Sequence, residues 1–248
     1  MKAPFRGLMA AAVLATSALV PTMAHAQTEA PSEIELSANV AIVTDYRFRG
    51  VSLSAGDFAI QGGVDAAHES GFYVGTWMSS LDETGSVYGS TELDLYAGYS
   101  TDLTDTLALD VGMLMYVYPD AEGCNCDYFE PYASVSTALG PVEASVGAAY
   151  AWDQDSLGGD NLYLYTDLGT GIPNTPLSLS AHLGWTDGVL APPFLAGEAD
   201  DTGFDWSVGA SATVLGKFDV GVSYIGTEGP NVKYFTDDAI VGTLSASF

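Results

Sequence analysis

The chain has 248 residues, of which 48% are hydrophobic and 11% aromatic, and it carries 32 acidic side chains against six basic ones. Such acidity excludes nucleic acid as a partner, because a strongly negative surface repels phosphates and the sequence holds no basic patch to offset it. The hydrophobic and aromatic content also excludes the disordered state that acidic, glycine-rich chains often adopt. We therefore expect an ordered fold.

The first 26 residues have the features of a secretory signal peptide. Lys2 and Arg6 precede an apolar run over residues 8–20, and a small-x-small cleavage site, Ala-His-Ala, ends at residue 26. An uncleaved membrane anchor is the alternative, but the run is too short to span a bilayer comfortably. No later stretch reaches about 18 consecutive apolar residues, so we expect no transmembrane helix. The sequence predicts a signal peptide over 1–26 and one mature domain over 27–248.

The mature chain alternates apolar and polar residues with a period of two, which is typical of β-strands whose two faces meet different surroundings. In 91–100, for example, Leu93 and Leu95 share one face while Glu92 and Asp94 share the other. The pattern predicts twelve strands, over 36–47, 58–67, 72–80, 91–100, 107–118, 129–139, 142–152, 161–169, 177–187, 204–215, 217–226 and 239–248.

The breaks between these strands alternate in length. Long breaks fall at 48–57, 81–90, 119–128, 153–160, 188–203 and 227–238, and short ones at 68–71, 101–106, 140–141, 170–176 and 216. Outer-membrane barrels show this rhythm, with tight periplasmic turns and long outer loops, whereas a soluble β-sandwich has no reason to keep it. Because strands in lipid must satisfy every backbone group, the sheet must close. We predict an all-β, transmembrane antiparallel up-and-down β-barrel of about 12 strands.

Aromatic residues on the apolar face gather near both ends of the predicted strands, as two membrane interfaces would select. Those near long breaks are Tyr46, Phe58, Phe129, Trp152, Trp185, Phe204 and Tyr224, and those near short breaks are Phe72, Tyr99, Phe218 and Phe248.

Ten acidic residues fall on the polar face of the strands, namely Asp45, Asp65, Glu92, Asp94, Asp110, Glu130, Glu143, Asp167, Asp205 and Asp219. A basic side chain on the lipid face costs about 2–4 kcal/mol at the bilayer midplane, and an acidic one somewhat less, so this parity indicates a polar lumen. Its carboxylates either favour cations, as acidic rings do in cation channels, or merely solvate the lumen without selectivity.

Arg47 and Arg49 share the parity of Asp45, which predicts that they point inward near the outer mouth. They form either an electrostatic constriction opposite lumenal acids or a salt-bridge network that fixes the first hairpin, and the two interpretations are compatible. Together with Asp65, Glu92, Asp94, Asp110, Glu130 and Asp167, these three residues are the predicted lining of the pore and its mouth.

Cys124 and Cys126 stand one residue apart in a predicted outer loop. This spacing suits a strained local disulfide in an oxidising compartment better than a metal site, which needs wider spacing and further ligands, or a redox role. Asp153 and Asp155 begin like a calcium loop, but Leu164 stands where the bidentate glutamate belongs. We expect no metal site.

His182 shares the predicted lumenal face with Ser178 and Ser180, which is the one hint of nucleophilic catalysis. No motif supports an activated serine, and no phosphate loop, haem motif or dinucleotide fingerprint is present. We therefore expect neither an enzyme nor a cofactor.

Several segments are similar to a known family. They are SANV at 37–40, DYRFRGVS at 45–52, QGGVD at 61–65, HESGFYVGTW at 68–77 and ELDLYAGY at 92–99, with weaker matches at 116, 118–119 and 130–132. Over 37–132 the chain resembles the TorF-type porin family of proteobacteria, and the resemblance implies an outer-membrane β-barrel. The Cys124-Asn125-Cys126 sequence and the loop 188–203 depart from the family pattern, which leaves specificity carried by the loops open.

These observations predict an outer-membrane porin of a Gram-negative bacterium that passes small hydrophilic solutes, cationic or neutral, through an acidic lumen. The expected partners are outer-membrane lipid and lipopolysaccharide, small solutes, and the barrel-assembly machinery, which would engage the final strand ending at Phe248. The alternatives are a closed structural or adhesive barrel whose acidic loops bind a partner or divalent ions, and a secreted β-sandwich that binds carbohydrate.

Overall fold

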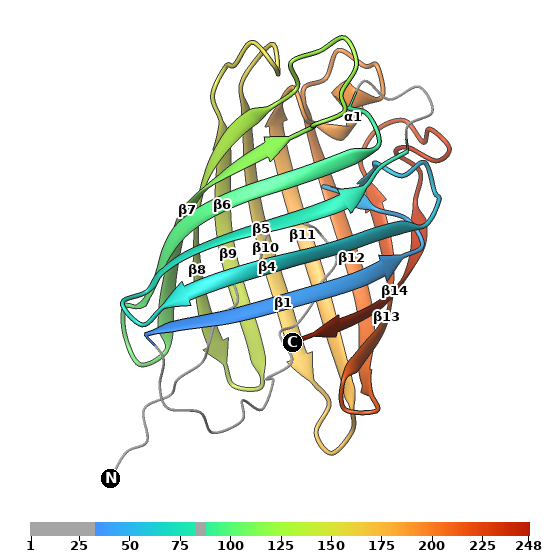
Figure 1. Cartoon of the computed structure of the whole chain (residues 1–248). Coiled ribbons are helices and arrows are strands. Elements are labelled where there is room, and N and C mark those ends of the chain that lie inside the picture. Colours follow the sequence, from blue (N-terminus) through green and yellow to red (C-terminus); the bar gives the residue numbers. More distant parts are fainter. Residues whose placement is uncertain (1–32, 83–87) are drawn as a thin grey trace.

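The computed structural model describes residues 33–82 and 88–248, so the predicted signal peptide over 1–26 lies outside the described residues. Twelve strands form one closed antiparallel barrel (Figure 1). They are β1 (Ile34–Val43), β4 (Ala59–His68), β5 (Phe72–Ser80), β6 (Thr91–Asp102), β7 (Leu107–Val117), β8 (Tyr128–Leu139), β9 (Val142–Ala151), β10 (Asn161–Gly171), β11 (Leu177–Gly188), β12 (Thr202–Val214), β13 (Phe218–Thr227) and β14 (Ala239–Ser247). Each strand pairs with its neighbours in chain order, and β1 pairs with β14 to close the wall. The predicted up-and-down barrel is confirmed.

The connections also follow the predicted rhythm. Short turns join the strands at the lower end of the barrel in Figure 1, and long loops join them at the upper end. We call these the short-turn end and the long-loop end. One long loop contains a short helix that the sequence pattern did not predict, α1 (Pro192–Leu195). Within the described residues no helix is both long enough and apolar enough to cross a membrane.

The wall has an apolar outer face and a polar inner face, as the alternation predicts. In β6, Leu95 is 44% exposed on the outside, whereas Glu92 and Asp94 are buried inside the barrel. The outward apolar set includes Leu36, Val40, Ile60, Val64, Val74, Val146, Leu168, Leu183, Val208, Val222 and Leu244. In water this surface would be a large exposed hydrophobic patch, so its natural surroundings are hydrocarbon.

Most of the predicted aromatic residues lie on this outer face near its two edges. Phe58, Phe129, Phe204 and Phe218 are exposed there. Tyr46 is a correction, because it is buried and turns into the barrel.

The first predicted strand, 36–47, is wrong at its C-terminal end. The wall strand β1 ends at Val43, Thr44 still exchanges hydrogen bonds with Gly242 of β14, and residues 45–57 fold away from the wall. They contain a small hairpin of β2 (Arg47–Phe48) and β3 (Val51–Ser52). The alternation of Asp45, Arg47 and Arg49 continues the parity of β1 into this hairpin, so the period alone could not reveal where the strand ended.

The inner wall is lined with aromatic rings that lie flat against glycines of neighbouring strands. A Cβ added to Gly98 would stand 2.3 Å from the Tyr73 hydroxyl, and one added to Gly112 would stand 2.4 Å from the Tyr132 hydroxyl. The same arrangement places Tyr96 on Gly75, Tyr165 on Gly147 and Tyr163 on Gly184. Glycine is needed at these positions because only a residue without a side chain lets the ring approach the backbone so closely. The rings therefore lie along the wall.

Candidate functional site

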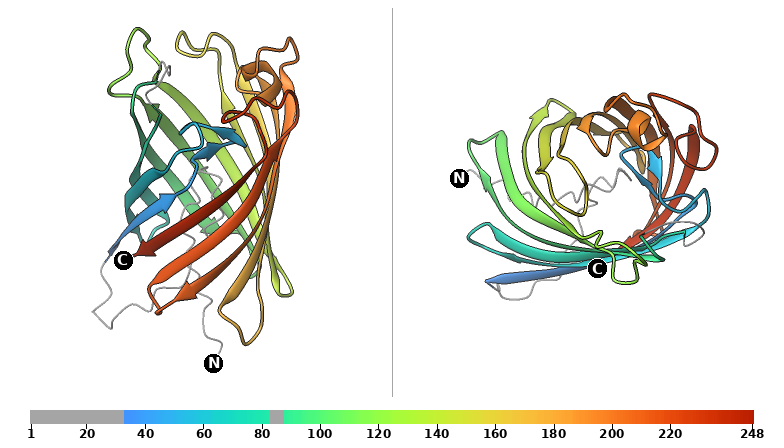
Figure 2. Two further views of the ribbon diagram at one scale, coloured as in Figure 1. Left: turned by 90° about the vertical axis from the view of Figure 1, so that its right-hand side faces the viewer. Right: turned by 90° about the horizontal axis from the view of Figure 1, so that it is seen from above.

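Residues 45–57, which we call the plug segment, lie inside the ring of strands at the long-loop end (Figure 2). The Tyr46 hydroxyl donates a hydrogen bond to Glu92 of β6 (2.8 Å), and the backbone N–H of Ser52 donates to the carbonyl of Phe235 (2.8 Å). Gly50 is so close to β13 that an added Cβ would stand 2.3 Å from Thr227. Since β6 and β13 are well separated around the twelve-strand wall, the plug segment contacts strands on opposite sides of the lumen.

A tight turn gives the plug segment its shape. Arg49 and Gly50 have φ angles of +48° and +78°, in the left-handed region that favours glycine. Within the segment, the Ser54 hydroxyl accepts a hydrogen bond from the Tyr46 backbone N–H (2.8 Å), and the Leu53 N–H donates to the Tyr46 carbonyl (2.8 Å). The hairpin is therefore internally bonded and presents its arginines as an ordered unit.

Arg49 joins the plug segment to the opposite wall. Its Nη2 donates to both carboxylate oxygens of Glu130, at 2.8 and 2.7 Å, and both side chains are almost completely buried. The guanidinium also lies over the rings of Tyr163 (4.2 Å) and Phe48 (4.7 Å), a favourable cation–π geometry. Burial alone would lower the pKa of Arg49, but the Glu130 carboxylate outweighs it and raises the pKa, so the arginine stays charged.

Arg47 joins the plug segment to the last long loop. Its Nε donates to Asp45 (2.6 Å), its Nη1 to the carbonyl of Gly50 (3.0 Å), and its Nη2 to the carboxylate of Asp237 (3.2 Å). Arg47 and Arg49 thus lie inside the barrel near its mouth, but on the hairpin and not on the wall as the parity argument assumed. The ion pairs that the salt-bridge interpretation requires are present.

The acidic residues of the predicted pore lining fall into two groups. Asp45, Glu92, Asp94 and Glu130 are buried in the layer of the plug segment. Burial, followed by the charge of Glu92, raises the pKa of Tyr46 well above its ordinary value, so its hydroxyl stays protonated and donates to Glu92.

The second group, which we call the lower carboxylates, comprises Asp65, Asp110 and Asp167, on β4, β7 and β10 nearer the short-turn end. They are partly exposed, and each has a neutral or histidine partner: Tyr96 for Asp65, Tyr73 for Asp110 (2.6 Å) and His182 for Asp167 (2.6 Å). The structure therefore separates the predicted residues into a buried layer and a more open section of the lumen.

His182 lies in a polar network that connects the two groups. Its Nδ1 contacts Asp167, and its Nε2 lies 2.7 Å from the Tyr163 hydroxyl and 3.1 Å from Asp205 Oδ1. Asp205 is almost completely buried. The strand parity had placed Asp205 and His182 inside, but no local pattern showed that they meet Asp167 and Tyr163.

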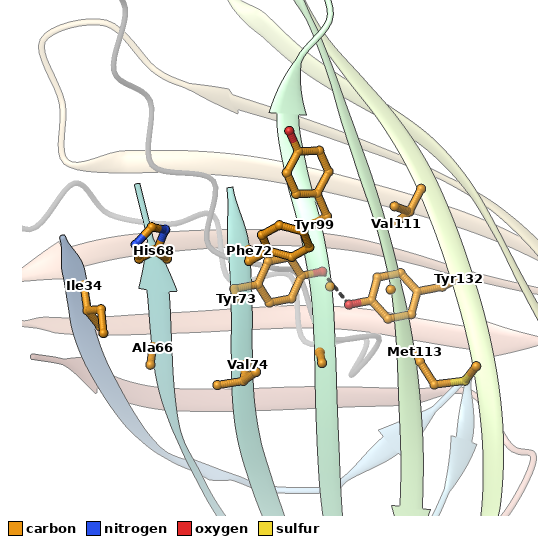
Figure 3. A pocket seen from close by; sticks show the side chains of 13 residues that line it. Ile34, Ala66, His68, Phe72, Tyr73, Val74, Tyr99, Val111, Met113 and Tyr132 are labelled. Carbon is orange, nitrogen blue, oxygen red and sulfur yellow. Dashed lines mark hydrogen bonds between the residues drawn. The ribbon is translucent and has the colours of Figure 1, made fainter. Parts of the chain in front are cut away.

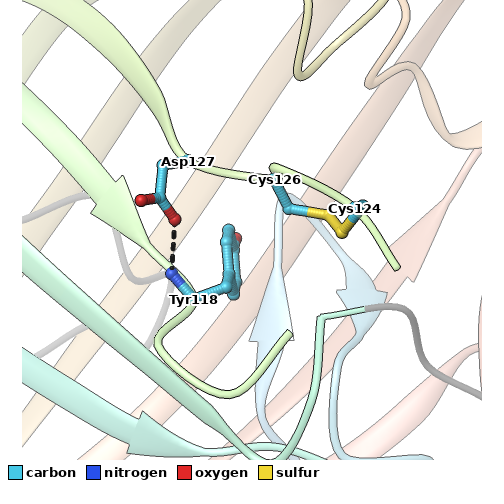
Figure 4. Close-up of a disulfide and its surroundings, with 4 residues drawn as sticks. All are labelled: Tyr118, Cys124, Cys126 and Asp127. Atoms are coloured by element: carbon cyan, nitrogen blue, oxygen red, sulfur yellow. Dashed lines mark hydrogen bonds between the residues drawn. A yellow bond between two sulfur atoms is a disulfide. The ribbon is translucent and has the colours of Figure 1, made fainter. Parts of the chain in front are cut away.

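Cys124 and Cys126 form a disulfide in the loop between β7 and β8 (Figure 4). In the same loop the backbone N–H of Tyr118 donates to Asp127 (2.9 Å). Cys126 is buried in one apolar cluster with Tyr46, Tyr118 and Tyr128. This loop therefore packs against the plug segment at the mouth of the barrel.

A pocket near the short-turn end is distinct from the plug layer (Figure 3). It is lined mainly by apolar side chains of β4 to β8, and the hydroxyls of Tyr73 and Tyr132 meet there at 2.5 Å. None of the predicted pore residues lines it. Over residues 33–82 and 88–248, no group of three or more His, Cys, Asp or Glu side chains is placed to hold a metal ion.

Solved structures of porins share this fold. The NanC porin in a rhombohedral crystal form is 10% identical, with a TM-score of 0.59 over 86% of this chain and 99% of that one. The KdgM porin is 6% identical, with a TM-score of 0.57 over 86% and 98%, and the KdgM porin in complex with disordered oligogalacturonate gives 0.56 over 86% and 97% at 6% identity. At such identities the likeness shows the fold alone.

Sequence comparison gives the family. No curated protein matches the chain. The name of the TorF-type family, which residues 37–132 resemble, is not confirmed and stays a resemblance. Residues 27–248 match the family described as "Bacterial protein of unknown function (Gcw_chp)", and the chain belongs to that family.

Proposed function

We propose that this protein is an outer-membrane porin that lets small hydrophilic solutes, cationic or neutral, diffuse through an acidic lumen. The observation that carries the proposal is the contrast between the two faces of the closed wall. The outer face is apolar along the strands, while the inner face presents partly exposed carboxylates. A barrel in lipid requires the apolar outer face, because hydrocarbon surrounds it. A passage for hydrophilic solutes is lined by polar groups such as those of the inner face.

The charges inside the barrel favour cations over anions. Both arginines of the plug segment are engaged with carboxylates, Arg49 with Glu130 and Arg47 with Asp45 and Asp237. The lower carboxylates, Asp65, Asp110 and Asp167, face tyrosine hydroxyls or His182. The fixed charge along the lumen is therefore negative, as in pores that use acidic side chains to attract cations.

We further propose that residues 1–26 direct export and that the barrel is placed in the bacterial outer membrane with its long loops outside.

In the structure the backbone of Phe248 exchanges two hydrogen bonds with Ala38 of β1 (2.8 and 3.1 Å). The final strand β14, together with Phe248 directly after it, thus closes the wall and is the proposed signal for the barrel-assembly machinery. Acidic loops would meet lipopolysaccharide through divalent ions.

Single-channel recording in a planar bilayer tests the proposal. We expect refolded protein to give discrete conductance steps, and a salt gradient to give a reversal potential of the sign that cation preference requires. Insertion that produces no steps would contradict the porin proposal. Failure to insert would contradict the membrane proposal itself.

A closed structural barrel is the second candidate, and the burial of the plug layer favours it. Arg47, Arg49, Glu92 and Glu130 are all buried in the same layer of the lumen. If the plug segment stays docked, solutes meet a filled cross-section. Liposome swelling with small sugars separates the candidates, because a closed barrel inserts without permitting swelling.

A further inference from the structure

Glu92 and Asp94 form a buried pair of carboxylates in the plug layer. They lie two residues apart on the inner face of β6, and they are only 1% and 2% exposed. One oxygen of each, Oε2 of Glu92 and Oδ1 of Asp94, has no hydrogen-bond partner among the described residues. A buried carboxylate oxygen without a partner is strongly unfavourable, so each of the two points to something that binds it.

The neighbouring groups leave this pair uncompensated. Tyr46 donates to the other oxygen of Glu92 but is neutral, and Tyr118, in the same buried cluster, is neutral as well. On the neighbouring strands, Asp94 stands opposite Trp77 and Tyr116. Both guanidiniums of the layer are already bound to other carboxylates, Arg49 to Glu130 and Arg47 to Asp45 and Asp237. Two adjacent buried carboxylates without a counter-charge need a cation or a proton.

We propose that Glu92 and Asp94 bind one small hard metal cation, of the Na⁺, Mg²⁺ or Ca²⁺ class, beneath Tyr46. Beside the two carboxylates stand the phenol of Tyr46 and, opposite Glu92 on β5, the hydroxyl of the buried Ser79. Oxygen ligands of this kind are those that hard cations prefer, with water completing the coordination. The surrounding rings pack closely on one another, Tyr46 on Trp77 (5.5 Å) and Tyr116 on Tyr128 (4.4 Å), so the occupant is a single ion and not an organic ammonium. The site does not depend on whether the barrel conducts.

Terbium luminescence tests this site, because Trp77 and Tyr46 stand beside the carboxylates and can sensitise a bound Tb³⁺ ion. The mature chain, refolded in detergent, is titrated with Tb³⁺ under tryptophan excitation. We expect saturable emission that Ca²⁺ displaces. The variants Glu92→Gln and Asp94→Asn should each weaken binding about tenfold, since affinity follows the number of charged ligands. Asp102→Asn, which removes a carboxylate at the exposed far end of the same strand β6, is the matched control and should leave binding unchanged.

Absence of sensitised emission, or equal emission from wild type and both variants, overturns the proposal. A proton shared by the two carboxylates is the competing explanation. Heat stability distinguishes a bound cation from a shared proton, and it is measured by the change in gel mobility when the barrel unfolds. A bound cation predicts that Ca²⁺ stabilises the wild type over chelator and stabilises Asp94→Asn less. Stabilisation by acid in chelator, with no effect of Ca²⁺, shows a proton and rejects the metal site. If one of the two variants does not fold, the other still decides, because each removes one ligand of the same ion.

Discussion

Arg49 is the residue on which docking of the plug segment depends most. Its partner Glu130 lies 81 residues away in the chain and has no exposed surface. Removing one member of a buried ion pair is far more destructive than replacing both, because the remaining charge is left without a partner.

We expect Arg49→Met to release the plug segment without unfolding the barrel. The uncompensated Glu130 costs about 3–5 kcal/mol, which the segment can avoid by leaving the lumen, whereas the hydrogen bonds of the wall do not depend on it. Single-channel conductance should rise above wild type. The double variant Arg49→Met/Glu130→Met should return toward wild-type conductance, and equal conductance of all three proteins would contradict this role.

The glycines beneath the inner rings are a second set of single residues with a measurable effect. Gly98→Ala should lower the free energy of unfolding by about 1–3 kcal/mol, because the new methyl group would overlap the Tyr73 ring and the backbone carbonyl of Val111. Urea unfolding followed by tryptophan fluorescence measures this.

Gly221→Ala is the control for that experiment. It also lies within a wall strand, yet its added Cβ would meet neighbouring atoms only at 3.6 Å or more. If Gly221→Ala lost as much stability as Gly98→Ala, the cause would be the backbone conformation of glycine and not a clash between the new methyl group and an aromatic ring.

At the scale of elements, the plug segment is the part that departs most from a plain barrel. Replacing residues 46–57 by a short glycine-serine link should raise conductance while preserving insertion, since the wall strands β1 and β4 on either side pair directly with each other. Conductance steps of wild-type size would show that the segment does not obstruct the passage. As a control, shortening the exposed loop stretch 197–201 should leave conductance unchanged.

The wall strands were predictable because each obeys one local rule. One face of each wall strand meets hydrocarbon and the other faces the lumen, so every second residue must be apolar. The alternation in the sequence therefore predicts β6 and β12 directly. The end of β1 could not be read, because Asp45, Arg47 and Arg49 keep the alternation after the chain has left the wall.

The candidate site was predictable in its composition but not in its contacts. Parity placed Glu92, Asp94 and Glu130 on the inner face, where the structure has them buried. That Arg49 reaches Glu130 and that Arg47 reaches Asp237 depends on which strands stand opposite each other after closure, and no local pattern carries that information. The Asp167–His182–Asp205 network was missed for the same reason.

At the scale of the whole molecule, the net charge of the lumen should decide which ions pass. The triple variant Asp65→Asn/Asp110→Asn/Asp167→Asn removes the lower carboxylates, and we expect its reversal potential under a salt gradient to move toward zero. The difference from wild type should shrink at high salt, because screening shortens the reach of fixed charges. Asp200→Asn/Asp201→Asn, in an exposed loop, is the control, and an equal shift there would assign selectivity to the loops.

The bonds of the plug segment also bear on how the chain folds. The segment follows the first wall strand, yet Arg47 binds Asp237 and Ser52 binds Phe235, next to the last wall strand. Contacts between such distant parts of a chain form late and slow folding, because a long loop must close first. We expect docking of the plug segment and pairing of β14 with β1 to favour each other, because the loop that carries Phe235 and Asp237 stands directly before β14. The first long loop of the barrel thus serves as a surface on which the final hairpin is assembled.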